Sequence, residues 1–300
     1  MGGSIVYVNT HNCEIYLANL FSNPTTVEII KLPPIKTLVD IDNPVPYWYG
    51  TTTGQLSTQI VYKIVMSSSP KDENCIVMLV YGPHDGGRLA FCRIGDDSWT
   101  KLKPKAETNR PILDIMYSNK DQLFYSLDWD SSIESWDLRS DAAAGTDFTS
   151  MICEEMNEMI RKYASFPNFL ICNMYLVESP ITGGVLHVWR YIFRIKCKEQ
   201  EISIDLTDMN LPNGGFDSIG NNALFLGFNN SFSVSIDEFP ELEPDRVYFA
   251  DDKRRYICCP ADDMRPIMGV HNLKDESMAP LYHNWYKFKH PRPIWVLASS

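Results

Sequence analysis

The amino-acid sequence predicts an all-β fold, and three observations lead to this prediction. Short segments rich in β-branched and aromatic residues, each bounded by Gly, Pro, Asn or Asp, occur along most of the 300 residues. Some of these segments alternate apolar and polar residues and others are apolar throughout, which indicates strands with one wet face mixed with strands covered on both faces. A similar unit ending also recurs along the chain. Together these features are typical of a β-propeller, in which small sheets stack around an axis.

Eight segments carry the strand signal most clearly. They are residues 75–82, 88–94, 122–129, 173–179, 185–193, 223–228, 231–236 and 246–250. Residues 223–226, ALFL, are apolar on both faces, as an inner strand requires.

The recurring ending is a strand that closes on Leu and is followed by a polar or Pro-rich turn. The Leu residues are separated by 70, 36, 68 and 67 positions, close to multiples of about 35; they are Leu32, Leu102, Leu138, Leu206 and Leu273. This spacing predicts about six or seven degenerate, kelch-like blades in a single domain over residues 1–300. A jelly roll or tandem sandwiches would also supply many strands, but they do not predict a recurring ending.

One segment departs from the strand pattern. Residues 140–147, SDAAAGTD, have the composition of a flexible linker, and an amphipathic helix is predicted directly after them, as an insert at about 148–165. Its apolar face is made by residues at helical spacing: Ile152, Met156, Met159, Ile160 and Tyr163.

Charge and composition exclude several classes of partner. The net charge is −11, so we expect no binding to nucleic acid, which requires clustered Lys and Arg. We also expect no membrane partner, because no apolar run approaches the ~20 residues that span a bilayer. The N-terminus has no secretory signal, and the eight cysteines show no disulfide or metal spacing. The sequence therefore predicts free thiols and a cytoplasmic or nuclear location.

A loop at residues 128–139 resembles a calcium loop in part. Asp128, Asp130 and Ser132 have the alternating oxygen spacing, but Ile133 stands where the loop requires Gly, and Arg139 where it requires Glu. We therefore predict no calcium site here.

The remaining candidates for chemistry also favour structural roles. Asp251 and Asp252 follow a strand, where adjacent side chains point to different sides and Asp commonly ends the strand. His187 lies within VLHVW and is predicted to be a strand side chain. No nucleophile, phosphate-loop or metal motif occurs. The sequence therefore predicts no catalytic, cofactor-binding or metal-binding residue and no cofactor.

The dipeptide Trp136-Asp137 is the ending found in WD repeats. A WD repeat also requires an upstream Gly-His pair and further copies of the ending, and neither occurs here. Trp136, and Trp99 at the same place in its unit, are therefore predicted to be packing anchors whose rings wedge against the next sheet.

Three longer blocks carry a resemblance to a known family. They are residues 63–102, 175–190 and 223–252, with LFSNPTTVEIIKLPPI at 20–35 and RPIWVLAS at 292–299 at the two ends. In order and wording they resemble the plant domain-of-unknown-function 295 family, the KIB-type β-propeller associated with F-boxes. Two departures stand out: no F-box precedes residue 5, and the Trp that the family usually has before ALFLG is missing from residues 194–222.

The resemblance implies a non-enzymatic protein–protein interaction module. In F-box relatives the propeller would select substrates for a ubiquitin-ligase adaptor by binding a target protein on one propeller face. Without an F-box, direct docking to the ligase scaffold is not expected. Two alternatives stay open: a propeller enzyme with carboxylates in the central channel, and a WD-type scaffold. The family provides no catalytic residue to carry over.

Overall fold

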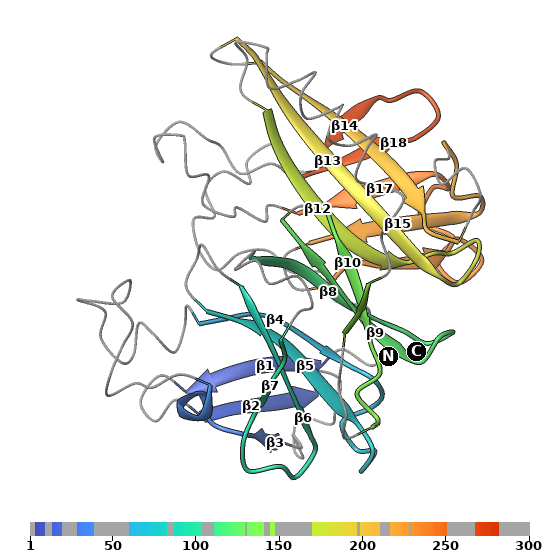
Figure 1. The fold of residues 1–300 in the computed structure, drawn as a ribbon. Helices are drawn as coiled ribbons and strands as arrows, with labels where there is room; N and C mark the ends of the chain where they lie inside the picture. The colour runs from blue at the N-terminus through green and yellow to red at the C-terminus, as the bar shows by residue number, and fades with distance from the viewer. Residues whose placement is uncertain are drawn as a thin grey trace.

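The computed structural model describes residues 4–9, 14–19, 29–38, 60–82, 87–103, 111–129, 131–140, 145–147, 170–196, 199–210, 217–227, 230–250 and 268–281. These residues form nineteen strands and one short 3-10 helix, η1 (Ile35–Thr37), and no α-helix (Figure 1). The all-β prediction is therefore confirmed for this part of the chain. The helix predicted at about 148–165 lies outside the described residues and stays a prediction.

The strands form five sheets that follow one another along the chain. Sheet 1 contains β1 (Ser4–Asn9), β2 (Glu14–Asn19) and β3 (Ile29–Leu32). Sheet 2 contains β4 (Val61–Met66), β5 (Ile76–Tyr81), β6 (Arg88–Arg93) and β7 (Thr100–Lys101). Sheet 3 contains β8 (Ile112–Ser118), β9 (Leu123–Asp128), β10 (Ile133–Trp136) and β11 (Gly145–Asp147). Sheet 4 contains β12 (Leu170–Glu178), β13 (Val185–Lys196) and β14 (Glu199–Asp208). Sheet 5 contains β15 (Asn222–Leu226), β16 (Phe232–Ser235), β17 (Arg246–Phe249), β18 (Gly269–Asn272) and β19 (Met278–Pro280).

Sheets 1 to 4 are antiparallel meanders, in which each strand pairs with the next one in the chain. Sheet 5 differs: its order is β16-β15-β17-β18-β19, and β15 and β17 run parallel. Strand β11 also corrects one expectation. Residues 145–147 belong to the stretch predicted as a linker, but they pair with β10 and extend sheet 3.

Strand β5 shows why the sheets stack. All six of its residues are buried. The odd-numbered residues from 77 to 81 pack in a cluster with sheet 1, and the even-numbered residues from 76 to 80 pack in a cluster with sheet 3. Because successive side chains of a strand point to opposite faces, a sheet covered on both faces requires an apolar residue at every position. The continuous apolar run in the sequence is explained in this way.

The same arrangement repeats along the chain, and Figure 1 shows the sheets following one another from sheet 1 (blue) to sheet 5 (orange). Four apolar clusters fill the four spaces between successive sheets. In β12, Met174 and Leu176 contact sheet 3, whereas Tyr175 and Val177 contact sheet 5. This face-to-face stacking of small sheets is the packing expected of propeller blades.

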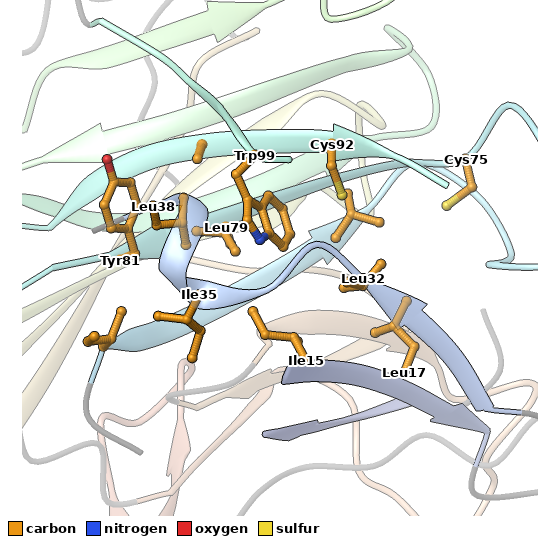
Figure 2. Packing of buried hydrophobic residues seen from close by; sticks show 13 residues of the cluster. Ile15, Leu17, Leu32, Ile35, Leu38, Cys75, Leu79, Tyr81, Cys92 and Trp99 are labelled. Atoms are coloured by element: carbon orange, nitrogen blue, oxygen red, sulfur yellow. The ribbon is translucent and has the colours of Figure 1, made fainter. Parts of the chain in front are cut away.

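The two anchor tryptophans lie between sheets, but on the side opposite to the prediction. Trp99 packs between sheets 1 and 2 (Figure 2), and its indole N–H donates to the Pro33 carbonyl at 2.8 Å. Trp136 packs between sheets 2 and 3, and its indole N–H donates to Ser126 Oγ at 2.9 Å. Each ring therefore wedges against the preceding sheet and not the next one. Each tryptophan comes late in its own unit, and its side chain lies on the face that is turned toward the sheet before it.

The recurring leucines fall one to a sheet. All five are buried, and none is more than 8% exposed: Leu32, Leu102, Leu138, Leu206 and Leu273. Among the described residues no further sheet lies between two of them. The described part holds five sheets, and the estimate of six or seven blades stays a prediction for the whole chain.

Candidate functional site

The partial calcium loop closes a turn. The Asp128 carboxylate is buried and accepts the Ser132 N–H at 2.9 Å, and the Asp128 N–H donates to the Ser132 carbonyl at 3.0 Å. Ile133, at the position that needs Gly, is fully buried in the core. Asp130 lies outside the described residues, as do Asp251 and Asp252.

Asp114 of β8 is a buried carboxylate that connects three sheets. It forms a buried ion pair with Lys63 of β4, and its other oxygen accepts the Leu176 N–H of β12 at 2.8 Å. One side chain thus connects the first strands of sheets 2, 3 and 4. The enzyme alternative would need several such carboxylates close together. In the described ranges no group of three or more His, Cys, Asp or Glu could hold a metal ion.

Each residue of this ion pair follows a β-bulge in its own strand. The register of β4 against β5 shifts between Val61 and Lys63, and that of β8 against β9 shifts between Ile112 and Asp114. An extra residue in one strand re-aims the side chain that follows it. Lys63 and Asp114 each come directly after a bulge, so both turn toward each other.

The surface best prepared for binding is the end of the sheets that carries three turns between first and second strands. We define it as the hairpin edge: residues 67–75 between β4 and β5, 119–122 between β8 and β9, and 179–184 between β12 and β13 (Figure 1). Loops at one end of a stack of sheets are the usual place for recognition, because the scaffold holds them rigidly.

The turn at 179–184 is built around a buried carboxylate. Asp208 of β14 is fully buried and accepts hydrogen bonds from the hydroxyls of Ser179 and Thr182 and from the Asn210 N–H. Gly184 packs so closely on Asn210 that a Cβ would lie 2.3 Å from its side-chain oxygen. The turn therefore has one conformation.

The neighbouring turn is joined to it from sheet 3. Lys120 donates from Nζ to the Thr182 carbonyl at 2.6 Å, and Asn119 donates to the Glu178 carboxylate at 3.1 Å. Ser233 of sheet 5 donates to the Glu178 carbonyl at 3.3 Å. These bonds connect three successive sheets at the hairpin edge.

Ile181 is the exposed apolar side chain on this rigid edge. It is 51% exposed, and it lies between Pro180 and Thr182 in the turn that is held by Asp208. The other large apolar side chains exposed in the described part are elsewhere: Ile29, Trp129 and Met278. An apolar side chain held in one position by its scaffold is suited to be an anchor for a partner, since little conformational entropy is lost on binding.

His187 has the strand position predicted for it, in β13. It is fully buried, its ring lies 4.6 Å from that of Trp189, and neither ring nitrogen has a hydrogen-bond partner. Burial lowers its pKa to about 3, so the imidazole is neutral in the folded protein. This role is structural, as the sequence indicated.

We expect stability to fall as the pH drops from 7 to 5. In the unfolded chain His187 would titrate near 6.5, so below that pH the unfolded state binds a proton that the folded state does not. Stability is full above about 6.5 and decreases toward the folded pKa, by about 2 kcal/mol at pH 5. Buried His271, whose pKa burial also lowers, adds in the same direction.

Urea unfolding at pH 7 and pH 5 checks this expectation. The His187→Leu variant should lose less stability over that interval than the unsubstituted protein, and His271→Leu provides a second comparison. An equal loss in the His187→Leu variant would contradict the assignment.

Small, mostly antiparallel sheets stacked face to face define the fold class as a β-propeller. The KIB1-4 beta-propeller family model matches residues 2–272. The chain belongs to this family, which confirms the resemblance seen in the three sequence blocks.

Two further proteins are similar to the chain. A putative F-box protein of Arabidopsis thaliana is 28% identical over 116 residues, which cover 39% of this chain and 30% of that protein. The chain thus spans less than a third of that relative's length. A crystal structure of a Lactobacillus plantarum protein covers 94% of this chain and 66% of its own, at 12% identity and a TM-score of 0.32. That likeness is too low to support an argument.

The cysteine and membrane predictions can be compared with the described residues. Cys75 and Cys92 are buried free thiols, as predicted, and burial raises the pKa of Cys92. The other six cysteines have no described side chain. In the described ranges no helix has the length and apolarity to cross a bilayer.

Proposed function

We propose that this chain is a non-enzymatic recognition module that binds a target protein through the hairpin edge. The observation that carries the proposal is Ile181: an apolar side chain, 51% exposed, on a turn fixed by a buried carboxylate and tied to the neighbouring sheets. Membership of a propeller family found in F-box proteins supports protein binding as the activity.

The proposal extends to the class of process. A propeller that fixes a target would supply the substrate-selecting half of a ubiquitin-ligase adaptor, in the cytoplasm or nucleus, and the docking to the ligase scaffold would be the task of an F-box. The surface of the target protein that contacts the hairpin edge would then be apolar at its centre, to receive Ile181, and polar around it, to meet Lys120 and Glu178.

We expect Ile181→Asp to abolish target capture without unfolding the protein. The side chain is exposed, so its replacement should change the free energy of unfolding by no more than about 0.5 kcal/mol. In the interface, however, a charge would replace the apolar anchor and would be desolvated without a partner. The measurement is affinity capture from plant extract with quantitative mass spectrometry, together with a melting curve.

Ile29→Asp is the matched control. Ile29 is 61% exposed and lies in sheet 1, away from the three turns. The target proteins are those retained by the unsubstituted propeller and by Ile29→Asp but not by Ile181→Asp. If Ile181→Asp retains the same proteins as Ile29→Asp, the hairpin edge is not the binding surface.

A further inference from the structure

Two Ser-Pro dipeptides occur in the chain, and Thr-Pro does not occur. They are Ser69-Pro70, in the turn between β4 and β5, and Ser179-Pro180, at the end of β12. Both therefore lie on the hairpin edge. Pro has no backbone N–H, so a kinase that modifies the preceding serine must accept a position that donates no hydrogen bond. Proline-directed protein kinases form that class.

The structure separates the two serines. Ser179 is buried, its hydroxyl donates to the Asp208 carboxylate, and its oxygen accepts the N–H groups of Ile181 and Thr182 at 3.3 and 3.2 Å. A phosphate there would place a second anion beside a fully buried carboxylate, which like-charge repulsion and desolvation oppose. Ser179 is therefore closed to modification in the folded protein.

Ser69 has the opposite surroundings. It is exposed, and its hydroxyl oxygen accepts a long hydrogen bond of 3.4 Å from the Lys71 N–H. The turn is held by bonds that do not use this hydroxyl: Asp72 N–H donates to the Ser69 carbonyl at 2.9 Å, Cys75 N–H donates to the Asp72 carbonyl at 2.9 Å, and Ile76 N–H donates to Ser67 Oγ at 2.9 Å. An enzyme can therefore reach Ser69 Oγ without opening the sheet.

We propose that Ser69 is a phosphorylation site for a proline-directed protein kinase. In the reaction, Ser69 Oγ forms a bond to the γ-phosphorus of ATP, the bond from that phosphorus to the β–γ bridging oxygen breaks, ADP leaves, and the hydroxyl proton passes to the kinase base. The product carries about −1.5 to −2 charge at neutral pH. Lys71, which follows in the turn, offsets part of it, and Asp72 and Glu73 add to it.

The effect of this phosphorylation on target binding rests on the proposed function of the hairpin edge. A dianion on the β4–β5 turn changes the charge of the edge that carries Ile181, and it would repel an acidic target and attract a basic one. Ser69 would then act as a switch of target selection without a change of fold.

The test uses the intact folded chain, ATP and a purified proline-directed kinase, with peptide mapping by mass spectrometry. We expect a single phosphate on Ser69, none on Ser179, complete loss of the phosphate in Ser69→Ala and a strongly reduced rate in Pro70→Ala. After denaturation in urea, dilution and immediate assay, or in a synthetic peptide of residues 175–185, Ser179 should become modifiable.

Three results would overturn the proposal. The first is a folded chain that stays unmodified at Ser69 while a peptide of residues 64–75 is phosphorylated, which would show that the turn is closed to the kinase. The second is failure of the same peptide as a substrate, which would exclude this class of kinase. Phosphate on Ser179 of the folded chain would refute the selection by burial. None of these readouts involves target capture, so they are independent of the Ile181 experiment.

Discussion

The Asp114→Leu variant is expected to lose about 3–5 kcal/mol of unfolding free energy. Asp114 is 3% exposed and Lys63 is 6% exposed, so removing the carboxylate leaves a buried ammonium group without its counter-charge. The Leu176 N–H loses its acceptor as well. Native proteins have only about 5–15 kcal/mol of stability, so this single change would bring the protein close to unfolding at ordinary temperature.

A double variant separates the contribution of the ion pair to stability from that of the hydrogen bond. The combined Lys63→Met and Asp114→Leu variant removes both charges, so it should recover most of the loss and retain a deficit of about 1–3 kcal/mol for the unpaired Leu176 N–H. Asp114→Asn keeps an oxygen for that N–H and serves as the control of shape. The measurement is guanidinium unfolding. A double variant as unstable as Asp114→Leu would show that the pair is not what stabilises this position.

The Trp136→Ala variant is expected to lose about 3–5 kcal/mol of unfolding free energy. Its ring is fully buried between sheets 2 and 3, and its removal leaves a cavity that the two sheets cannot close without shifting against each other. The Ser126 hydroxyl, which accepts the indole N–H, loses a partner in the same change.

Trp129→Ala is the matched control, because it removes the same side chain only seven residues away in the chain. Trp129 is 59% exposed, so its loss should change stability by no more than about 0.5 kcal/mol. Trp136→Phe should lie between the two, since it keeps much of the ring volume. Equal midpoints of denaturation for Trp136→Ala and Trp129→Ala would contradict the role of Trp136 as an inter-sheet anchor.

Local sequence was sufficient for eight of the nineteen described strands, those that lie in the eight segments with the strand signal. The sequence also predicted that strands apolar throughout are covered on both faces, because the side-chain period of a strand is two, and the structure shows this for Ile76–Tyr81. His187 was recognised as a strand side chain in the same way. The family resemblance came from blocks of sequence and needed no geometry.

The candidate site was visible only in part. Strands were predicted at 173–179 and 185–193, on either side of this turn. Nothing near them in the sequence indicated Asp208, which accepts hydrogen bonds from that turn and lies in β14. Ile181 was also missed, because it is an isolated apolar residue between Pro180 and Thr182 and belongs to no periodic pattern. Its exposure depends on where the turn ends and the solvent begins.

The sequence by itself determined that this protein is all-β, that its sheets are stacked on both faces and that it has the blocks of a KIB-type propeller, because these properties follow from side-chain period and composition over a few residues. Only the tertiary structure decided the pairing of Lys63 with Asp114, since the two residues lie 51 positions apart and each is aimed by a bulge that breaks the period. It also decided that Trp99 and Trp136 pack on the preceding sheet. The exposure of the Ser69 side chain and the burial of Ser179 against Asp208 were likewise decided only by the tertiary structure. The physical reason is the same in each case: burial and charge pairing depend on which sheet lies opposite, and a local pattern contains no information about the neighbour.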